Sequence, residues 1–136
     1  MEPWEVVDSY FCKICEIPEE ELNPESHSLV QVWHSFGLIQ NGGFHSYLCT
    51  VGDEALKVAE HYRSIGSEAG AGLIEQLAQL WRQYRSPHSP DESDPDSFRE
   101  LFDSELDDIE EKFYDLEESL IDALFPIAER GTHTNG

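Results

Sequence analysis

Basic residues are few in this sequence: 8 Lys and Arg stand against 29 Asp and Glu, which gives the 136-residue chain a formal net charge of −21. Proteins that bind DNA or RNA carry basic patches, and an anionic membrane surface repels a protein of this charge. The shortage of bases therefore argues against direct binding to nucleic acid or to a membrane. Basic protein surfaces and small cations remain as partners.

Cysteines and long apolar runs are also scarce. The three cysteines, Cys12, Cys15 and Cys49, are an odd number, and the chain shows no secretory signal pattern at its start. A disulfide-stapled secreted protein is therefore not expected, and the sequence predicts a cytoplasmic location. The longest uncharged stretch, residues 28–50, is interrupted by three glycines and several polar residues. It does not resemble a membrane span, which needs about 20 apolar residues.

Alternating β-branched runs are missing, and helical periodicity dominates instead. Hydrophobic residues make up 39 % of the chain and aromatic residues 11 %, which is enough for one core. We expect an all-α protein of five to six helices in a single domain over residues 1–130, with an exposed loop over 86–94 and a disordered tail over 131–136. Apolar residues at steps of three and four place the helices at residues 4–14, 29–36, 44–51, 55–65, 69–84 and 98–124.

Turn and cap residues set the expected helix ends. The glycines between Gly37 and Gly43 predict that the second helix stops there, and Gly52-Asp53 predicts a turn before the next helix. Ser67 is a plausible N-cap, and Asp94-Pro95 is a cap followed by proline at the first helical position. Pro126 is expected to end a long acidic C-terminal helix of about seven turns.

Negative charge is unevenly distributed along the chain. Residues 1–26 carry a net −7, residues 27–86 only −1, and residues 87–136 carry −13. A uniformly acidified surface would not leave the middle of the chain nearly neutral. In the C-terminal region Asp103, Asp107, Glu111 and Asp115 are four residues apart, where like charges oppose helix formation by roughly 0.2–0.5 kcal/mol per pair.

Two explanations fit this acidic helix. A straight helix over residues 98–122 would be about 37 Å long and carry one carboxylate per 3.4 Å, roughly the phosphate spacing of one DNA strand. The acids then form a recognition surface for a basic partner. Alternatively, they form a solvated face that keeps the protein soluble. If the acids serve binding, neutralising Asp103, Asp107 and Glu111 should weaken the binding of the partner and slightly raise the thermal stability of the protein.

A family resemblance bears on this choice. The stretch Asn41-Gly42-Gly43-Phe44-His45-Ser46-Tyr47-Leu48 and the closing pattern Leu106-Asp107-Asp108 through Lys112-Phe113-Tyr114 resemble the DNA mimic protein 19-like domain over residues 26–125. The resemblance implies an all-helical, often dimeric domain. One characterised member of that family imitates DNA phosphates with surface carboxylates and occupies the DNA-binding face of a transcription regulator. The structural family-motif residues would be Asn41, Gly42, Gly43, Phe44 and Tyr47.

The resemblance transfers no catalytic residue, so the candidate binding residues come from this chain's own acids. They would meet the Lys and Arg that a nucleic-acid-binding protein uses for phosphates. The expected function is thus an acidic protein-binding module, a DNA-mimic-like inhibitor of a basic partner and not an enzyme. An immunity protein that blocks a basic nuclease toxin is the alternative. The candidates are Glu100, Asp103, Asp107, Glu110, Glu111, Glu117 and Glu118, with Asp91, Glu92, Asp94 and Asp96 as an extension.

Metal or redox chemistry is a third class of function for this sequence. Cys12 and Cys15 form a lone Cys-x-x-Cys in an apolar helical stripe, without the second ligand pair of a structural zinc site, and are expected to be structural. A metal-dependent enzyme could use His27, His34, His45, Asp53 and the cysteines, but no metal-ligand spacing appears. We therefore expect neither a metal nor a cofactor. The first-helix stripe Trp4, Val7, Phe11 and Ile14 and the later aromatics Trp33, Trp81 and Tyr84 are expected in the core.

Overall fold

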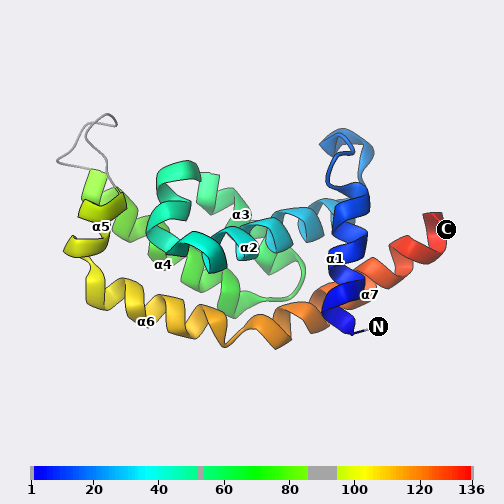
Figure 1. Cartoon of the computed structure of the whole chain (residues 1–136). Helices are drawn as coiled ribbons and strands as arrows, with labels where there is room; N and C mark the ends of the chain where they lie inside the picture. Colours follow the sequence, from blue (N-terminus) through cyan, green and yellow to red (C-terminus); the bar gives the residue numbers. More distant parts are fainter. Residues whose placement is uncertain (1, 52–53, 86–94, 136) are drawn as a thin grey trace.

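The computed structural model describes residues 2–51, 54–85 and 95–135 (Figure 1). Within these ranges the chain forms α-helices and one short 3-10 helix without any strand, which confirms the expected all-α class. None of the helices in this part of the chain is long and apolar enough to span a bilayer. The helices are α1 (Pro3–Ile14), α2 (Pro24–Val51), α3 (Ala55–Ser64), α4 (Glu68–Arg85), α5 (Pro95–Leu101), α6 (Asp103–Tyr114) and α7 (Glu117–Asn135), with the 3-10 helix η1 (Glu19–Glu21) between α1 and α2.

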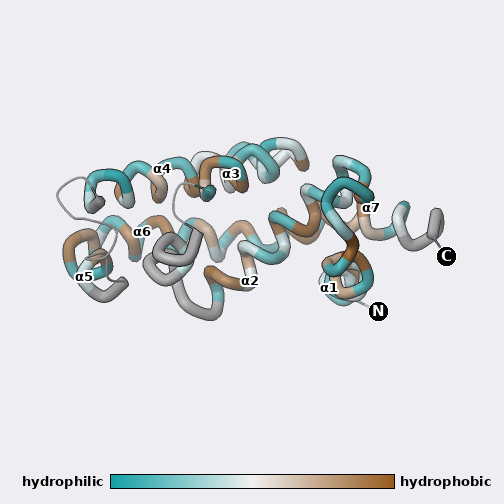
Figure 2. Tube along the Cα trace, turned by 90° about the horizontal axis from the view of Figure 1, so that it is seen from above, coloured by the Kyte–Doolittle hydropathy of each residue, from teal (hydrophilic) through white to brown (hydrophobic). Residues whose placement is uncertain are grey.

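Helices α6 and α7 follow one another along one long edge of the molecule, and α5 stands at the end of this edge where α6 begins (Figure 1). We call the three helices together the acidic edge. Helices α3 and α4 form a hairpin, seen as a separate layer in Figure 2, and α2 packs on α3 and on the acidic edge. Helix α1 crosses α7 near the chain termini. The polar side of α5 to α7 is therefore the outer boundary of the fold.

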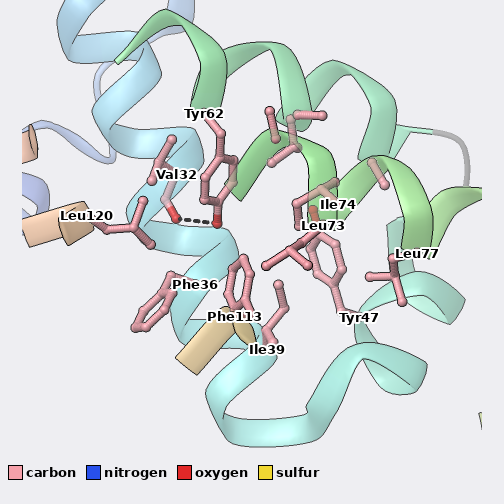
Figure 3. Close-up of a cluster of buried hydrophobic side chains, with 14 of the residues drawn as sticks. Val32, Phe36, Ile39, Tyr47, Tyr62, Leu73, Ile74, Leu77, Phe113 and Leu120 are labelled. Atoms are coloured by element: carbon pink, nitrogen blue, oxygen red, sulfur yellow. Dashed lines mark hydrogen bonds between the residues drawn. The ribbon is translucent and has the colours of Figure 1, made fainter. Parts of the chain in front are cut away.

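The core lies where α2, the α3–α4 hairpin and the acidic edge meet (Figure 3). Phe36 of α2 and Tyr62 of α3 both contact Phe113 of α6, with ring centroids 5.3 and 5.9 Å apart. The Tyr62 hydroxyl is buried but shares a hydrogen bond with Ser35 Oγ at 2.8 Å. Burial raises the pKa of Tyr62 well above its ordinary value, although the Ser35 hydrogen bond opposes the shift. One inward residue of α6 thus ties the acidic edge to the other layers.

Helix α2 corrects the expected stop at Gly37–Gly43. It continues to Val51, so the separate helix predicted from Phe44 is part of α2. Glycine permits a turn but does not require one, and a helical glycine costs only about 1 kcal/mol relative to alanine. Ile39 and Tyr47, on either side of Gly42-Gly43, are both buried in the core. Packing on both sides of the glycines outweighs their weak helix propensity.

The long acidic helix expected over residues 98–124 is three helices. Phe102, with φ −119° and ψ 32°, separates α5 from α6, and a second break follows Tyr114. Phe102 and Leu116, at the two breaks, pack partly buried against the core. Each break also places carboxylates in the first turn of a new helix, where the helix dipole favours them. Neither break is marked by glycine or proline, so periodicity alone misses them.

Helix α7 does not end at Pro126 as expected. It passes through this proline and ends at Asn135, so it includes residues 131–135 of the segment predicted to be a disordered tail. Ile127 and Ala128 are buried immediately after the proline. Gly131 lies so close to α1 that a Cβ there would overlap the ring of Tyr10. The packing of α1 on α7 accounts for the continuation.

Other expected helix ends are confirmed. Gly66 has φ +94° at the end of α3, and Ser67 caps α4 by accepting a hydrogen bond from the Gly70 amide at 3.2 Å. Helix α5 begins at Pro95. The expected turn at Gly52-Asp53 and the expected loop over residues 86–94 lie outside the described residues.

Candidate binding surface on the acidic edge

The outward side of α6 is built by helical periodicity. Leu106, Ile109 and Phe113 are buried, so most of the intervening acids point away from the core. Glu110 is the exception, because its side chain is only 16 % exposed. The predicted row of acids at steps of four is exposed along its whole length: Asp103, Asp107, Glu111 and Asp115. The sequence therefore placed this row correctly on the surface, although it misjudged the helix that carries it.

Arg99 neutralises part of this row from within the molecule. Its guanidinium donates to Asp103 Oδ1 at 3.0 Å, to Glu110 Oε1 at 3.1 Å, and to Asp107. Its side chain is only 24 % exposed. Burial lowers the Arg99 pKa, but Glu110, Asp107 and Asp103 together raise it above its ordinary value. Three of the seven predicted binding carboxylates are thus ion-paired in the free protein.

The other bases of the acidic edge are also engaged. Lys112 pairs with Asp108 at 3.1 Å, and Arg130 of α7 pairs with Glu25 of α2 at 2.9 Å. Together with Arg99 they are all the Lys and Arg residues of α5, α6 and α7. Several exposed acids of this edge, in contrast, form no ion pair with any other described residue. They are Glu100, Glu105, Glu111, Asp115, Glu117 and Glu118.

The structure divides the predicted binding residues into three groups. Asp103, Asp107 and Glu110 surround Arg99, whereas Glu100 and Glu111 are exposed on the same edge and pair with no other described residue. Glu117 and Glu118 lie beyond the second break, in the first turn of α7. The spacing of one carboxylate per about 3.4 Å, which the sequence predicts for a straight helix over residues 98–122, does not hold here because the edge is broken into three helices. The extension, Asp91, Glu92, Asp94 and Asp96, falls on positions or side chains outside the described residues.

Two histidines meet away from the acidic edge. The rings of His27 and His61 are 4.6 Å apart; His27 Nε2 is 3.3 Å from Glu19 Oε1, and His61 Nδ1 shares a hydrogen bond of 2.9 Å with Ser28 Oγ. Burial, followed by the charge of His27, lowers the His61 pKa, while Glu19 opposes the shift.

The structure does not bring together, in the described part of the chain, the residues of the metal site that the sequence left as an alternative. His34 stacks on Phe11 instead of joining His27. No group of three or more His, Cys, Asp or Glu side chains among the described residues is placed to hold a metal ion. Asp53 and the His45 side chain lie outside the described residues.

The expectations for α1 need correction. Cys12 and Cys15 are exposed free cysteines and not part of the core. Trp4, expected on the buried stripe, is 49 % exposed, and Tyr10 is buried where Phe11 was expected. Trp33 is only partly buried, whereas Trp81 and Tyr84 are core residues as expected. The sequence therefore missed Trp4 as a surface residue, because its spacing from Val7 fits a buried face.

Within the family motif, Tyr47 is buried at 3 % exposure, and its hydroxyl has no hydrogen-bond partner among the side chains and backbone that the structure describes. Burial raises the Tyr47 pKa above its ordinary value. The side chains of Asn41, Gly42, Gly43 and Phe44 lie outside the described residues. For Tyr47 the structural role expected of the motif agrees with its place in the core.

These features define an acidic all-helical protein whose exposed carboxylates concentrate on one edge. Residues 20–130 match the family described as DMP19-like protein, and this match covers more than half of the chain. The chain belongs to the DMP19-like protein family, as the resemblance in the sequence indicated. Comparison with curated proteins and with solved structures gave no significant match.

Proposed function

We propose that this protein is a cytoplasmic binding module that occupies the basic, nucleic-acid-binding face of a partner protein. It acts by competition and needs no catalytic step. The observation that carries the proposal is the charge arrangement of the acidic edge. Every Lys and Arg of α5 to α7 is ion-paired within the molecule, while Glu100, Glu105 and Glu111 remain exposed and form no ion pair with any residue that the structure describes.

Arg99 supports the proposal by showing how this edge binds a guanidinium. Three carboxylates from two successive turns of α6 converge on one arginine. Arginine pairs with carboxylates and phosphates through the same fork of donors, so a carboxylate row can replace a phosphate row as its partner. The unpaired carboxylates would meet arginines of the partner in the same manner.

The experiment compares two variants of equal net charge. The edge variant carries Glu100→Gln, Glu105→Gln and Glu111→Gln; the control carries Glu16→Gln, Glu20→Gln and Glu21→Gln, which are exposed acids before α2. Both variants and the wild type are immobilised and exposed to native lysate, and retained proteins are eluted with a salt series and identified by mass spectrometry. Each retained protein is then tested for binding to duplex DNA with and without the wild type.

The expected result is a basic protein that elutes as salt rises, is lost by the edge variant and kept by the control, and releases DNA when the wild type is added. Exposed ion pairs weaken as the salt concentration rises, so a retained protein that forms more ion pairs with the acidic edge should elute at a higher salt concentration. If the retained protein is a nuclease whose activity is blocked, the immunity function is favoured over transcriptional control. Equal retention by both variants would contradict the role assigned to the acidic edge.

A further inference from the structure

Helix α1 crosses the start of α7 (Figure 1). Side chains of α1, α2 and α7 line a groove there. It has a volume of about 550 Å³ and is lined chiefly by Trp4, Asp8, Trp33, Glu117, Glu118 and Ile121. A smaller hollow of about 260 Å³ adjoins it and shares Trp4, Glu118 and Ile121. We call the two together the Trp4 groove. Its volume is within the range of about 300–1,000 Å³ typical of ligand sites.

The Trp4 groove combines aromatic surface with uncompensated negative charge. Its lining contains five carboxylates and no Lys, Arg or His: Glu2, Asp8, Glu117, Glu118 and Asp122. Trp4 is 49 % exposed, which is unusual for the largest apolar side chain. An indole face beside carboxylates attracts a cation through both the ring quadrupole and direct charge.

Two hydrogen bonds fix the walls of the groove before any ligand arrives. Trp33 Nε1 donates to Asp8 Oδ1 at 2.9 Å, which joins α2 to α1 and orients the Trp33 ring. Gln40 Nε2 lies 3.5 Å from Glu117 Oε1, across the interface between α2 and α7. Each bond engages one oxygen of a carboxylate, and the second oxygen can still accept from a ligand.

The geometry points to a site in the Trp4 groove for an arginine side chain from an extended basic segment of the partner protein. The guanidinium stacks on the Trp4 indole, and its donors face Glu117 and Glu118. Arginine fits better than lysine because its planar fork can stack and pair with carboxylates at once, whereas lysine is a compact, strongly hydrated point charge. Arg63 and Arg99 show that this chain already holds arginines among three carboxylates each.

This inference rests on the proposed function for the nature of the partner, but the groove itself is a distinct feature. Trp4 and Asp8 belong to α1, which precedes the residues 20–130 matched to the family. The site therefore depends on a part of this chain that the family match does not include. Peptide titration tests the groove alone, while lysate capture with the edge variant tests the function, so one can fail without the other.

The test uses the three indole N–H signals of the ¹⁵N-labelled full chain. Trp4 and Trp33 line the groove, and Trp81, which is 4 % exposed, serves as an internal reference. The probes are blocked glycine peptides containing two arginines, two lysines or two citrullines, at constant ionic strength. Citrulline has nearly the shape of arginine without its charge. The arginine peptide should shift the Trp4 and Trp33 signals to saturation and leave Trp81 unchanged, the lysine peptide should bind more weakly, and the citrulline peptide should not bind.

Variants sharpen the test. Trp4→Leu should lower the affinity for the arginine peptide about fivefold, and because Trp4 is half exposed this variant should still fold, as checked by its melting curve. Glu117→Gln with Glu118→Gln should lower the affinity about tenfold. The charge-matched control, Glu20→Gln with Glu21→Gln, lies beyond the other end of α1, about 16 Å away along its axis, and should change the affinity by less than about twofold.

Three results would overturn the inference. One is equal binding of arginine and lysine peptides without movement of the Trp4 and Trp33 signals. Another is an equal loss of affinity in the groove and control double variants, which would show nonspecific attraction by net charge. The third is a Trp4 signal that depends on protein concentration and not on peptide, with matching sedimentation velocity, because the groove would then bind a second copy of the chain.

Discussion

The α3–α4 hairpin and the acidic edge each contain one arginine surrounded by three carboxylates, yet their charges differ greatly. In the hairpin, Arg63 binds Glu60 at 2.6 Å, Glu68 at 3.1 Å and Glu75 at 2.5 Å. Hydrogen bonds that Arg63 donates to Glu75 and Glu68 raise the Arg63 pKa above its ordinary value. Residues 27–86 carry a net −1, whereas residues 87–136 carry −13.

The two regions differ in how many acids have no basic partner once the three around the arginine are counted. All acids of α3 and α4 have a basic partner, and even Glu54 before α3 pairs with Lys57 at 3.2 Å. On the acidic edge Glu105 and Glu111 have none among the described residues. Helices of this fold can therefore be built with balanced charge. The surplus on one edge is an added feature, which favours a binding surface over general solubility.

The largest expected effect comes from the packing of the α3–α4 hairpin and does not involve charge. A Cβ on Gly70 would lie 2.7 Å from Tyr62 Cδ1 and 2.8 Å from Ser67 Oγ, whereas nothing lies within 4 Å of a Cβ on Gly72. Gly70→Ala should destabilise the protein by about 1–3 kcal/mol, because Tyr62 is fully buried and cannot move aside. Gly72→Ala should stabilise it by up to about 1 kcal/mol. Urea denaturation of both variants measures the difference, and similar midpoints would contradict the close packing.

Next in size is the removal of each arginine. Arg99→Gln should cost roughly 1 kcal/mol, the upper end for exposed ion pairs, because three acids lose their partner in a region already strongly negative. Arg63→Gln should cost less, since its surroundings are nearly neutral. Chemical denaturation at low and high salt checks both variants. The gap between them should narrow as salt screens the remaining acids, and a larger cost for Arg63→Gln would reverse the comparison.

A smaller effect concerns acid sensitivity of the hairpin. Burial, together with His27, lowers the His61 pKa below its ordinary value of 6.5. The stabilisation from neutral His61 is therefore fully present above pH 6.5 and is lost as the pH falls through the folded-state pKa. His61→Gln should keep a partner for Ser28 and flatten the dependence of the unfolding free energy between about pH 7.5 and about pH 5.5. An unchanged slope would show that other groups dominate.

The smallest expected effect is the stability change caused by a Glu→Gln substitution, which should have opposite signs in the two regions. Glu111→Gln should stabilise the protein by roughly 0.2–0.5 kcal/mol, because it removes an unpaired acid four residues from Asp107 and Asp115. Glu60→Gln should instead destabilise it, since Glu60 pairs with Arg63. Asp103 and Asp107 behave like Glu60, so neutralising them should not add the stability that the sequence alone suggests. Thermal melts of the two variants under the same conditions measure both stability changes. Changes of equal sign would contradict the distinction between the two regions.

Much of the fold could be predicted because local patterns encode it. Leu73, Leu77, Trp81 and Tyr84 repeat at helical spacing and are all in the core, and Ser67 marks a helix start by its side-chain chemistry. The break at Phe102 and the continuation of α2 through Gly42-Gly43 and of α7 through Pro126 could not be predicted, since each depends on which residues nearby pack against other helices. Tertiary burial decides these places, and local propensity does not.

The candidate surface was predicted only in part for the same reason. The exposed row on α6 follows from periodicity, but the contacts of Arg99 with Asp107 and Glu110 require the bend at Phe102, which brings α5 close to successive turns of α6. Residues 4, 7, 11 and 14 fit one stripe, which predicts that all four face the core. The structure buries Val7 and Ile14 as predicted, but it buries Tyr10 in place of Phe11 and exposes Trp4, since the neighbours of α1 are residues far away in sequence.

The buried side of α6 has a consequence for the entropy of binding. Leu106, Ile109 and Phe113 anchor the helix in the core, so its outward carboxylates are held on an ordered backbone in the free protein. An acidic disordered tail of equal charge would lose backbone freedom on binding, at roughly 1–2 kcal/mol per ordered residue. Here that loss has already occurred during folding. Binding through this edge should therefore show a small entropic penalty and a heat-capacity change set by the contact area alone.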